Sequence, residues 1–461
     1  FVEPTPGAPN SVGSSAPPEE VVFSVPTKTF TDTVTVTLSS PTAGAVIRYT
    51  TDGAVPVEDI NAPSEVYSGA LTFDDTVQLR ARAFLPGSIP GPTHSEAYIK
   101  LAADYASFTS KLPILILDNF GRGAPSSDRM FYALLFETKG PDNLADLRNM
   151  PDLATRSRAK TRGSSTGGDP KFNLSWETWD ENDEDKDISP LGLPPESDWV
   201  LNSPYNFDRA LMRNPFMYEM SNQAGQWAPR SKMIEVFANT DGEEVDNESV
   251  SRSDYFGVYA LMEKVSRGRD RLDVSSLDRT DNEEPEVTGG YMWKVDRLDP
   301  GDRGLRGIRD ASNEIGWIYP KEQVNRVRVV TDEQEAYLVG YFNEMVAALK
   351  ADDFTNPDTG KHYTEYMDVP SWLNEHILRG LSKDPDAFRL STYLNKPRGG
   401  KIHYGPIWDF DRTMGSEDGR DLNPVGWDGG SQWWTYPWWR EVVWEPGRRR
   451  NNAGDPDFMQ A

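Results

Sequence analysis

Acidic residues in the C-terminal third of the chain have the types and spacing that phosphoryl transfer requires. Asp386 follows the amphipathic stretch 371–381, and further along Asp409 and Asp411 flank a phenylalanine. Phosphoryl transfer uses one carboxylate to accept the proton of the attacking hydroxyl, and others to hold the metal ion that bridges the phosphates. On spacing alone, loop carboxylates that only cap the backbone or face solvent fit these residues equally well.

A segment rich in glycine and serine could contact a phosphate group. Residues 163–167 read GSSTG, and Lys171 begins the strand-like stretch that follows. Kinases hold a triphosphate with the backbone N–H groups of such a hairpin and with a lysine ammonium. The same letters match the nucleophile elbow of serine hydrolases, but that elbow leads into a helix, whereas a strand follows here. Taken alone, the segment is also typical of an ordinary surface hairpin.

A run of acids, DENDEDKD at residues 180–187, could attract a hard cation such as calcium. The EF-hand pattern fails, because Ile188 occupies the position that requires glycine and Pro194 the position of the bidentate glutamate. We therefore predict a solvated acidic loop.

The composition excludes several classes of protein and site. The 461 residues carry a formal net charge of −25, which disfavours binding to nucleic acid or to an anionic membrane surface. No cysteine is present, so disulfides, thiolate metal sites and cysteine nucleophiles are excluded. The sequence has no run of about 18 apolar residues, so we predict no membrane span. The 14 Trp, 18 Tyr and 19 Phe indicate a folded chain.

We expect three regions along the chain. Residues 1–20 are rich in Pro, Gly and Ser, which is typical of a linker. Residues 21–100 show the period-two alternation of strands, for example at 33–38 and at 77–83, where the charged side chains are predicted to point outward. Short strands at this spacing predict a small β-sandwich.

Residues 101–461 are the second, larger domain of this scheme. The apolar run 112–118 predicts a strand that is covered on both faces. A capping box at Thr331 predicts the start of an amphipathic helix, and the stretch 371–381 predicts a second one. Because mixed strands precede the helices without regular βαβ alternation, we assign this domain to the α+β class.

The first domain resembles a known module. Residues 49–56 read YTTDGAVP. This motif is similar to the Tyr-Thr-Thr-Asp-Gly-x-x-Pro signature of the immunoglobulin-like (Ig-like) module found at the C-terminus of chitobiases, and the likeness covers most of residues 22–98. We therefore expect an Ig-like all-β sandwich here, and contact with glycans stays open as a role for it.

The second domain resembles the CotH kinase family, relatives of the spore coat protein H kinase. The blocks that carry the resemblance are RGSS at 162–165 with PK at 170–171, DWVL at 198–201, Asp208, RN at 213–214, GVYALMEK at 257–264, TGGY at 288–291, DPDAFRLST at 384–392 and GPIWDFD at 405–411. They occur in this order through the region from residue 112 to the end.

The resemblance implies an atypical protein-kinase-like fold that transfers phosphate from ATP, with Mg²⁺ or Mn²⁺, to Ser or Thr of secreted proteins. Asp386 would be the catalytic aspartate, and Asp409 would coordinate magnesium as the Asp of a DFG motif does. Asp411 would be a second metal ligand or would hold the loop in place. The nucleotide contacts implied by the matching blocks are Lys171, Arg162, Ser164 and Glu263.

Two departures from the family pattern bear on activity. Asp384 stands where the family often has Asn, and Ser391 stands five residues after Asp386, where a protein kinase has a metal-binding Asn. The alternative to an active kinase is therefore a catalytically inactive kinase-like scaffold displayed on a cell surface. The intact Asp386 and Asp409 favour the enzyme.

Both ends of the chain resemble cuts in a longer protein. Residues 1–11 resemble the tail of a lamin-tail domain, and the chain stops where family members continue with further helices. We expect a fragment of a larger protein that is secreted and acts on an unidentified protein substrate. The Trp-rich stretch 426–444 could stack on sugar rings, although aromatic residues this dense more often pack a core.

Overall fold

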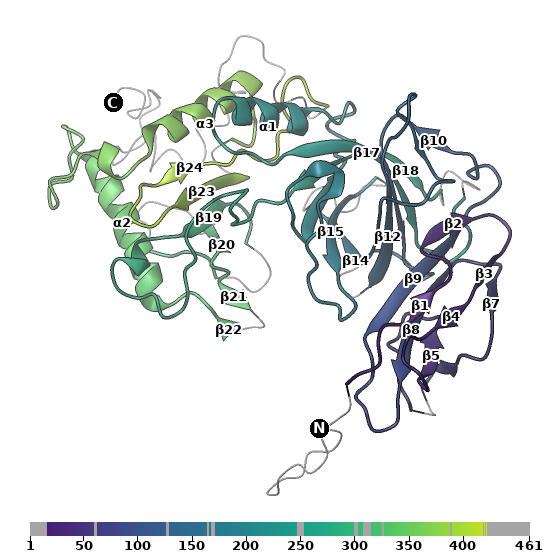
Figure 1. Cartoon of the computed structure of the whole chain (residues 1–461). Coiled ribbons are helices and arrows are strands. Elements are labelled where there is room, and N and C mark those ends of the chain that lie inside the picture. The colour runs from purple at the N-terminus through teal and green to yellow at the C-terminus, as the bar shows by residue number, and fades with distance from the viewer. Residues whose placement is uncertain are drawn as a thin grey trace, which may run out of the picture. The chain divides into compact units, whose positions relative to one another are not determined.

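The structure, a computed structural model, describes most of the chain (Figure 1). The described residues are 16–59, 62–125, 129–163, 166, 171–246, 253–298, 303–307, 315–324, 327–387, 390–417, 419 and 421. Most of the predicted linker, up to residue 15, and the Trp-rich stretch 426–444 lie outside them. Residue contacts group the chain into two compact units, each described by itself: unit 1 holds Phe1–Ser203 and Lys232–Met262, and unit 2 holds Pro204–Ser231 and Glu263–Ala461.

Unit 1 opens with the β-module, residues 16–100, where the Ig-like domain is expected. Its strands are β1 (Val22–Phe23), β2 (Lys28–Phe30), β3 (Val34–Val36), β4 (Leu38–Ser39), β5 (Val46–Thr50), β6 (Glu65–Val66), β7 (Leu71–Phe73), β8 (Val77–Phe84) and β9 (Thr93–Lys100). One sheet has the order β2-β9-β8-β5-β6, while β1 pairs with β4 and β3 with β7. In β3 the buried Val34 and Val36 alternate with the exposed Thr35, as the period-two pattern predicts.

The rest of unit 1 is built on a closed barrel. In spatial order its strands are β11 (Ile114–Asp118), β12 (Met130–Phe136), β14 (Leu153–Arg162), β15 (Asn173–Trp179), β16 (Asp198–Asn202), β18 (Tyr255–Glu263) and β17 (Ser231–Asn239). Outside the barrel, β10 (Thr109–Ser110) pairs with β13 (Ala145–Asp146). All side chains of β11 are buried, which confirms the prediction that this strand is covered on both faces.

Strand β9 connects the core of the β-module with that of the barrel. Tyr98 packs in the module core, whereas Ala97 and Ile99 pack in one cluster with Ile114 and Tyr132 of the barrel. Successive side chains of a strand point to opposite faces, so this one strand contributes to both cores. The β-module is therefore joined to the barrel by apolar packing as well as by the chain itself.

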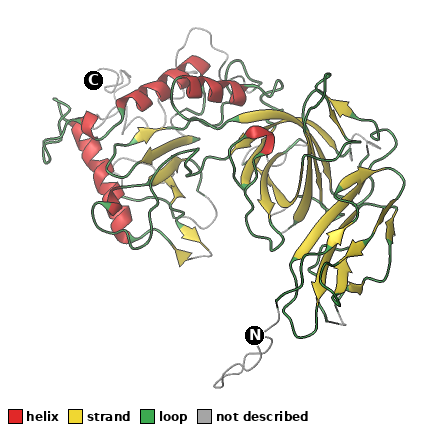
Figure 2. Cartoon of the chain, viewed as in Figure 1, coloured by secondary structure: helices red, strands yellow, loops and turns green. Residues whose placement is uncertain are grey.

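Unit 2 contains the α-helices of the described chain, whereas strands dominate unit 1 (Figure 2). Its helices are α1 (Arg213–Gln223), α2 (Asp332–Lys350) and α3 (Val369–Ser382). Its four-stranded sheet is β20 (Ile315–Tyr319), β19 (Tyr291–Val295), β23 (Thr392–Lys396) and β24 (His403–Tyr404) in spatial order, and β21 (Gln323–Val324) pairs with β22 (Val327–Arg328). Short 3₁₀ turns complete the chain at η1 (Pro190–Gly192) in unit 1, and at η2 (Glu286–Thr288) and η3 (Tyr363–Glu365) in unit 2.

Both predicted helices are confirmed. The Thr331 hydroxyl accepts from the Gln334 N–H, and the Gln334 side chain accepts from the Thr331 N–H, each at 3.2 Å, so the predicted capping box starts α2. Leu338 and Phe342 of this helix pack against Trp293 of β19 in the core of unit 2. No helix among the described residues is both long and apolar enough to cross a membrane.

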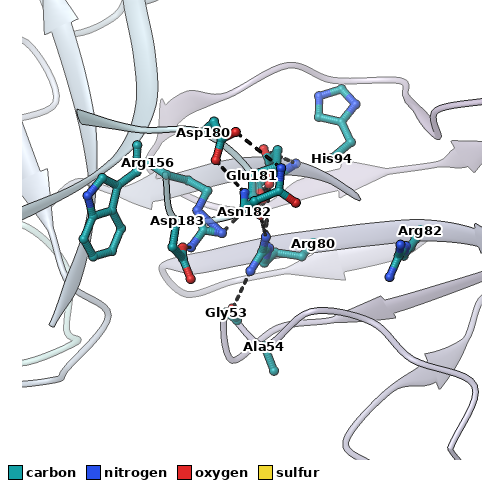
Figure 3. A network of polar contacts seen from close by, with 12 residues as sticks. Gly53, Ala54, Arg80, Arg82, His94, Arg156, Asp180, Glu181, Asn182 and Asp183 are labelled. Carbon is teal, nitrogen blue, oxygen red and sulfur yellow. Dashed lines mark hydrogen bonds and ion pairs between the residues drawn. The ribbon is translucent and has the colours of Figure 1, made fainter. Parts of the chain in front are cut away.

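Of two predictions about exposed charges, one is wrong and one is confirmed. Arg80 in β8 is buried, although the alternation of that strand predicts outward-pointing charges. The acidic stretch 180–187 is confirmed as a largely solvated loop, since residues 182–187 are exposed. Two of its acids nevertheless have partners, because Glu181 pairs with Arg80, and Asp183 pairs with the buried Arg156 (Figure 3). Periodicity could not reveal these pairs, because each arginine meets an acid that lies far along the chain.

Candidate active site

The two aspartates that flank Phe410 lie together just after β24. Asp409 has a positive φ of 68°, in the left-handed region that residues with a Cβ rarely adopt. Its backbone N–H donates to the Tyr218 hydroxyl at 3.3 Å, and its Oδ2 accepts from Ser391 Oγ at 3.1 Å. Asp409 itself is exposed, so its carboxylate is positioned by neighbours and remains open to a ligand.

Asp411 is buried and hydrogen-bonded to Asp409. Burial raises the pKa of Asp411 well above its usual range, and the charge of Asp409, their hydrogen bond and the charge of Asp386 add to the shift. Two carboxyl groups this close share a proton or a cation. Mg²⁺ commonly takes one or two carboxylates and fills its shell with water and phosphate oxygens, so the pair fits magnesium. Among the described residues, no group of three or more His, Asp or Glu is arranged to hold a metal, so nucleotide or water ligands would have to complete the shell.

Asp386 lies in the turn after α3 and is half-buried. Its backbone N–H donates to Asp384 Oδ1 at 2.9 Å, and the other oxygen of Asp384 pairs with Arg379. Burial raises the pKa of Asp384 to about 6, against the opposing charge of Arg379. An Asn at position 384, as the family often has, could accept from the Asp386 N–H but could not neutralise the Arg379 guanidinium. The pairing with Arg379 therefore explains the aspartate at this position.

The Arg379 guanidinium, on α3, connects the segments that carry the acids. It is fully buried and donates to Glu375 Oε2 at 2.9 Å, to Asp384, and to the Ser391 carbonyl at 3.0 Å. The guanidinium carbon also lies 5.3 Å from the centre of the ring of Phe410, the residue between Asp409 and Asp411 in the sequence. Burial lowers the pKa of Arg379, but the charges of Glu375 and Asp384 outweigh it and raise the pKa overall, so the group stays charged.

Helix α1 also contacts the loop that contains Asp409 and Asp411. The Phe410 N–H donates to Asn214 Oδ1 at 2.6 Å, one turn before Tyr218 on this helix. Arg213 pairs with the buried Asp208 at 3.0 Å and donates to the Gly415 carbonyl at 3.2 Å. Sequence analysis gave none of these residues a role.

Sequence signals for the supporting residues existed. Asp208, Arg213 and Asn214 stand in the blocks that resemble the family. Arg379 is a charge within the apolar face of a helix, which is typical of a buried, paired group. Only the fold shows that these side chains support Asp386 and Asp409.

Lys171 belongs to unit 1 and begins the strand-like segment that leads into β15. Its Nζ donates to the Val258 carbonyl at 2.8 Å and lies 4.9 Å from the centre of the Tyr259 ring. Burial lowers the pKa of Lys171 to about 8, with a smaller opposing contribution from Glu235. Burial thus disfavours the charged form of this half-buried lysine. A lysine with such a lowered pKa is more typical of a residue that acts in a functional site than of one that stabilises the fold.

Lys171→Met is expected to raise the melting temperature at pH 7 by about 2–4 °C, the shift that corresponds to roughly 1 kcal/mol. The lysine pKa is lowered on folding, so the wild-type protein gains stability as pH rises from about 8 to 10.5, and the advantage of the variant shrinks over that range. Thermal unfolding at pH 7 and pH 10 measures both effects. The exposed Lys160 of β14 gives the matched control Lys160→Met, which should change little. A lower melting temperature in Lys171→Met would make the lysine a structural cation.

The remaining predicted nucleotide contacts lie in different settings. Glu263 is the last residue of β18, and its contacts group it with unit 2, which begins again at this residue. It is fully buried and accepts from Arg230 N, Nε and Nη2 at 2.8, 2.9 and 2.7 Å. Arg271 lies 3.8 Å from it, so its carboxylate is occupied by two arginines. Arg162 ends β14 opposite Asn173 of β15, and Ser164 lies outside the described residues.

Comparisons with known proteins agree with these features. A family model described as chitobiase/beta-hexosaminidase C-terminal domain matches residues 25–95, and one described as CotH kinase protein matches residues 159–451. A search of curated proteins finds no match. The second model covers more than half of the chain, and its range includes every candidate site residue. The chain belongs to the CotH kinase protein family and carries a chitobiase-like domain ahead of the family region.

Proposed function

We propose that this protein is an active atypical kinase, with an α+β kinase-like fold, that transfers the γ-phosphate of ATP to Ser or Thr of a protein substrate outside the cell. The observation that carries the proposal is the arrangement of Asp386, Asp409 and Asp411 around the buried Arg379. Arg379 pairs with Asp384, two residues before Asp386, and lies against the ring of Phe410, between Asp409 and Asp411 in the sequence. The match to the CotH family supports the same reaction class.

In the proposed reaction each residue of the chain has a separate task. Asp386 orients the substrate hydroxyl and accepts its proton while the hydroxyl oxygen bonds to the γ-phosphorus and the bond to the β-phosphate oxygen breaks, which releases ADP. Asp409 and Asp411 would hold Mg²⁺, which would neutralise charge on the phosphates when bound. Lys171 stays a proposed phosphate ligand because it follows the glycine-rich motif in the sequence. Ser391 orients Asp409 through its hydroxyl, at the position where protein kinases use a metal-binding Asn.

The direct test is incorporation of labelled phosphate from ATP into the protein itself and into a generic Ser/Thr acceptor, with Mg²⁺ or Mn²⁺. Labelling on serine or threonine that requires the metal supports the kinase. A protein that shows neither labelling nor a change in melting temperature with ATP and metal would instead be an inactive scaffold.

The role of Asp411 is testable separately from that of Asp409. Asp411→Asn keeps the shape and a hydrogen bond to Asp409 but removes one of the two adjoining charges. We expect the Mg²⁺ concentration for half-maximal labelling to rise about 10- to 100-fold, with activity recovering at high metal. A metal titration of both proteins measures this, and the exposed Asp358→Asn in the same unit serves as the charge-matched control. An unchanged metal requirement would leave Asp411 only the task of holding the loop.

A further inference from the structure

The loop after β15 is bound to the β-module by charged and polar contacts. Arg80 of β8 donates through Nη2 to the Glu181 backbone carbonyl at 2.7 Å and to its carboxylate at 3.2 Å. Ser95 of β9 donates to the same carboxylate through its N–H at 3.1 Å and its hydroxyl at 2.6 Å. Figure 3 shows Arg80 reaching from the β-module to Glu181, and on its other side to the Gly53 carbonyl at 3.0 Å.

A second arginine approaches the same loop from the barrel. Arg156 of β14 pairs with Asp183, and its Nη1 lies 3.9 Å from the Glu181 carboxylate (Figure 3). Arg80 and Arg156 are 1 % and 3 % exposed, so two guanidinium groups are buried close together. Burial lowers the pKa of Arg80, and the charge of Arg156 lowers it further, while Glu181 opposes both. The Glu181 carboxylate thus lies near both Arg80 of the β-module and Arg156 of the barrel. Its loss would leave buried positive charge uncompensated.

The strands next to these residues lead to the candidate phosphate contacts. In the antiparallel β14–β15 hairpin, Arg156 pairs with Trp179 at one end and Arg162 pairs with Asn173 at the other. At about 3.4 Å per residue, the two ends are about 20 Å apart. At the far end Arg162 closes β14, and Lys171 stands two residues before β15 in the sequence. The β-module therefore binds one end of the hairpin, and the other end carries Arg162 and Lys171, two of the residues assigned to ATP.

We propose that Arg80, Arg156, Glu181 and Asp183 form a clasp through which the β-module braces the β14–β15 hairpin and so supports phosphate binding at its far end. The clasp makes the chitobiase-like domain a positioning part of the catalytic chain, bound to it by the paired charges and by the apolar packing of β9. The expected effect on ATP binding rests on the proposed function, whereas the expected stabilisation of the β14–β15 hairpin does not. These four residues are positioning residues, not catalytic ones.

The test compares Arg80→Gln and Glu181→Gln with Arg82→Gln in the full chain. Arg82 lies two residues along the same strand, apart from the clasp in Figure 3, and donates to the Gly91 carbonyl within the β-module. Hydrogen exchange of the amides in residues 153–162 and 173–179, measured without nucleotide, is expected to accelerate about tenfold in both clasp variants and to stay unchanged in the control. If Arg80→Gln does not fold, Glu181→Gln decides in the same way, since it keeps the backbone carbonyl that Arg80 contacts.

Nucleotide binding separates this inference from the proposed function. In the clasp variants we expect the dissociation constant for ATP with Mg²⁺ to rise about threefold or more, and the control to bind as the wild type does. Unchanged exchange in the hairpin would overturn the clasp, even in a wild-type protein that binds ATP. Faster exchange with unchanged ATP affinity would overturn the support of phosphate binding. A wild-type protein that binds no ATP would overturn the proposed function, and the exchange result would still decide whether the module braces the hairpin.

Discussion

Asp386→Asn is expected to reduce phosphate transfer by about 10²- to 10⁴-fold, the usual range for loss of a positioned general base. The substitution keeps the backbone N–H that donates to Asp384, so the turn after α3 should retain its shape. An amide cannot accept the hydroxyl proton, and the loss should therefore appear in kcat rather than in the KM for ATP. Initial rates of labelled-phosphate incorporation over a series of ATP concentrations measure the two separately.

Asp409→Ala is also expected to lose phosphate transfer, but through loss of metal binding rather than loss of the base. Comparison of the two variants therefore separates the roles of Asp409 and Asp386. Removal of this exposed carboxylate takes away a proposed metal ligand, so the variant should lose the rise in melting temperature with ATP and Mg²⁺ that Asp386→Asn retains. Asp358→Asn, an exposed carboxylate of the same unit, should behave as the wild type in both assays. Full activity in Asp386→Asn would show that Asp386 is not the general base. Retained ATP binding in Asp409→Ala would show that Asp409 is not a required metal ligand.

Local patterns predicted the elements whose signals lie within a few neighbouring residues. The continuous apolar run of β11 reports burial on both faces, and the capping box at Thr331 reports the first turn of α2, because each is a property of adjacent positions. Strands β14 and β15 likewise pair with each other on either side of the glycine-rich segment, where the sequence predicts a hairpin. The closed barrel and the strand order of unit 2 depend on pairings between distant segments, which no local pattern contains.

The candidate site shows the same division between local and distant information. Asp409 and Asp411 are two residues apart, so their closeness could be predicted, and so could their suitability for a cation. Arg379 and Tyr218 come from two helices, and their contacts with the loop depend on how those helices fold. The buried Arg80 was mispredicted for a related reason, since its acid partner lies beyond the end of the β-module. Charges become interpretable only when their partners are known.

Arg379→Met is expected to lower the free energy of unfolding by about 3–5 kcal/mol, the range for removing one partner of a buried charge pair. The substitution leaves Glu375 and Asp384 fully buried without their common cation. It also removes the donor to the Ser391 carbonyl and the contact with the Phe410 ring, so phosphate transfer should fall as well. Urea denaturation at pH 7.5 measures the stability change, with Lys383→Asn, just after the same helix, as a control expected to shift it by less than about 0.5 kcal/mol.

The pH dependence and a compensated variant decide whether the uncompensated charge causes the loss. Burial already raises the pKa of Asp384 to about 6 and raises that of Glu375, and loss of the arginine raises both further. The folded variant then binds more protons than the unfolded chain, so its deficit should shrink as pH falls from 7.5 to 5. Glu375→Gln and Asp384→Asn added to Arg379→Met should restore most of the stability, because neutral amides need no cation. If the triple variant stays as unstable as Arg379→Met, the lost packing of the arginine stem, and not the charge, holds this part of the site together.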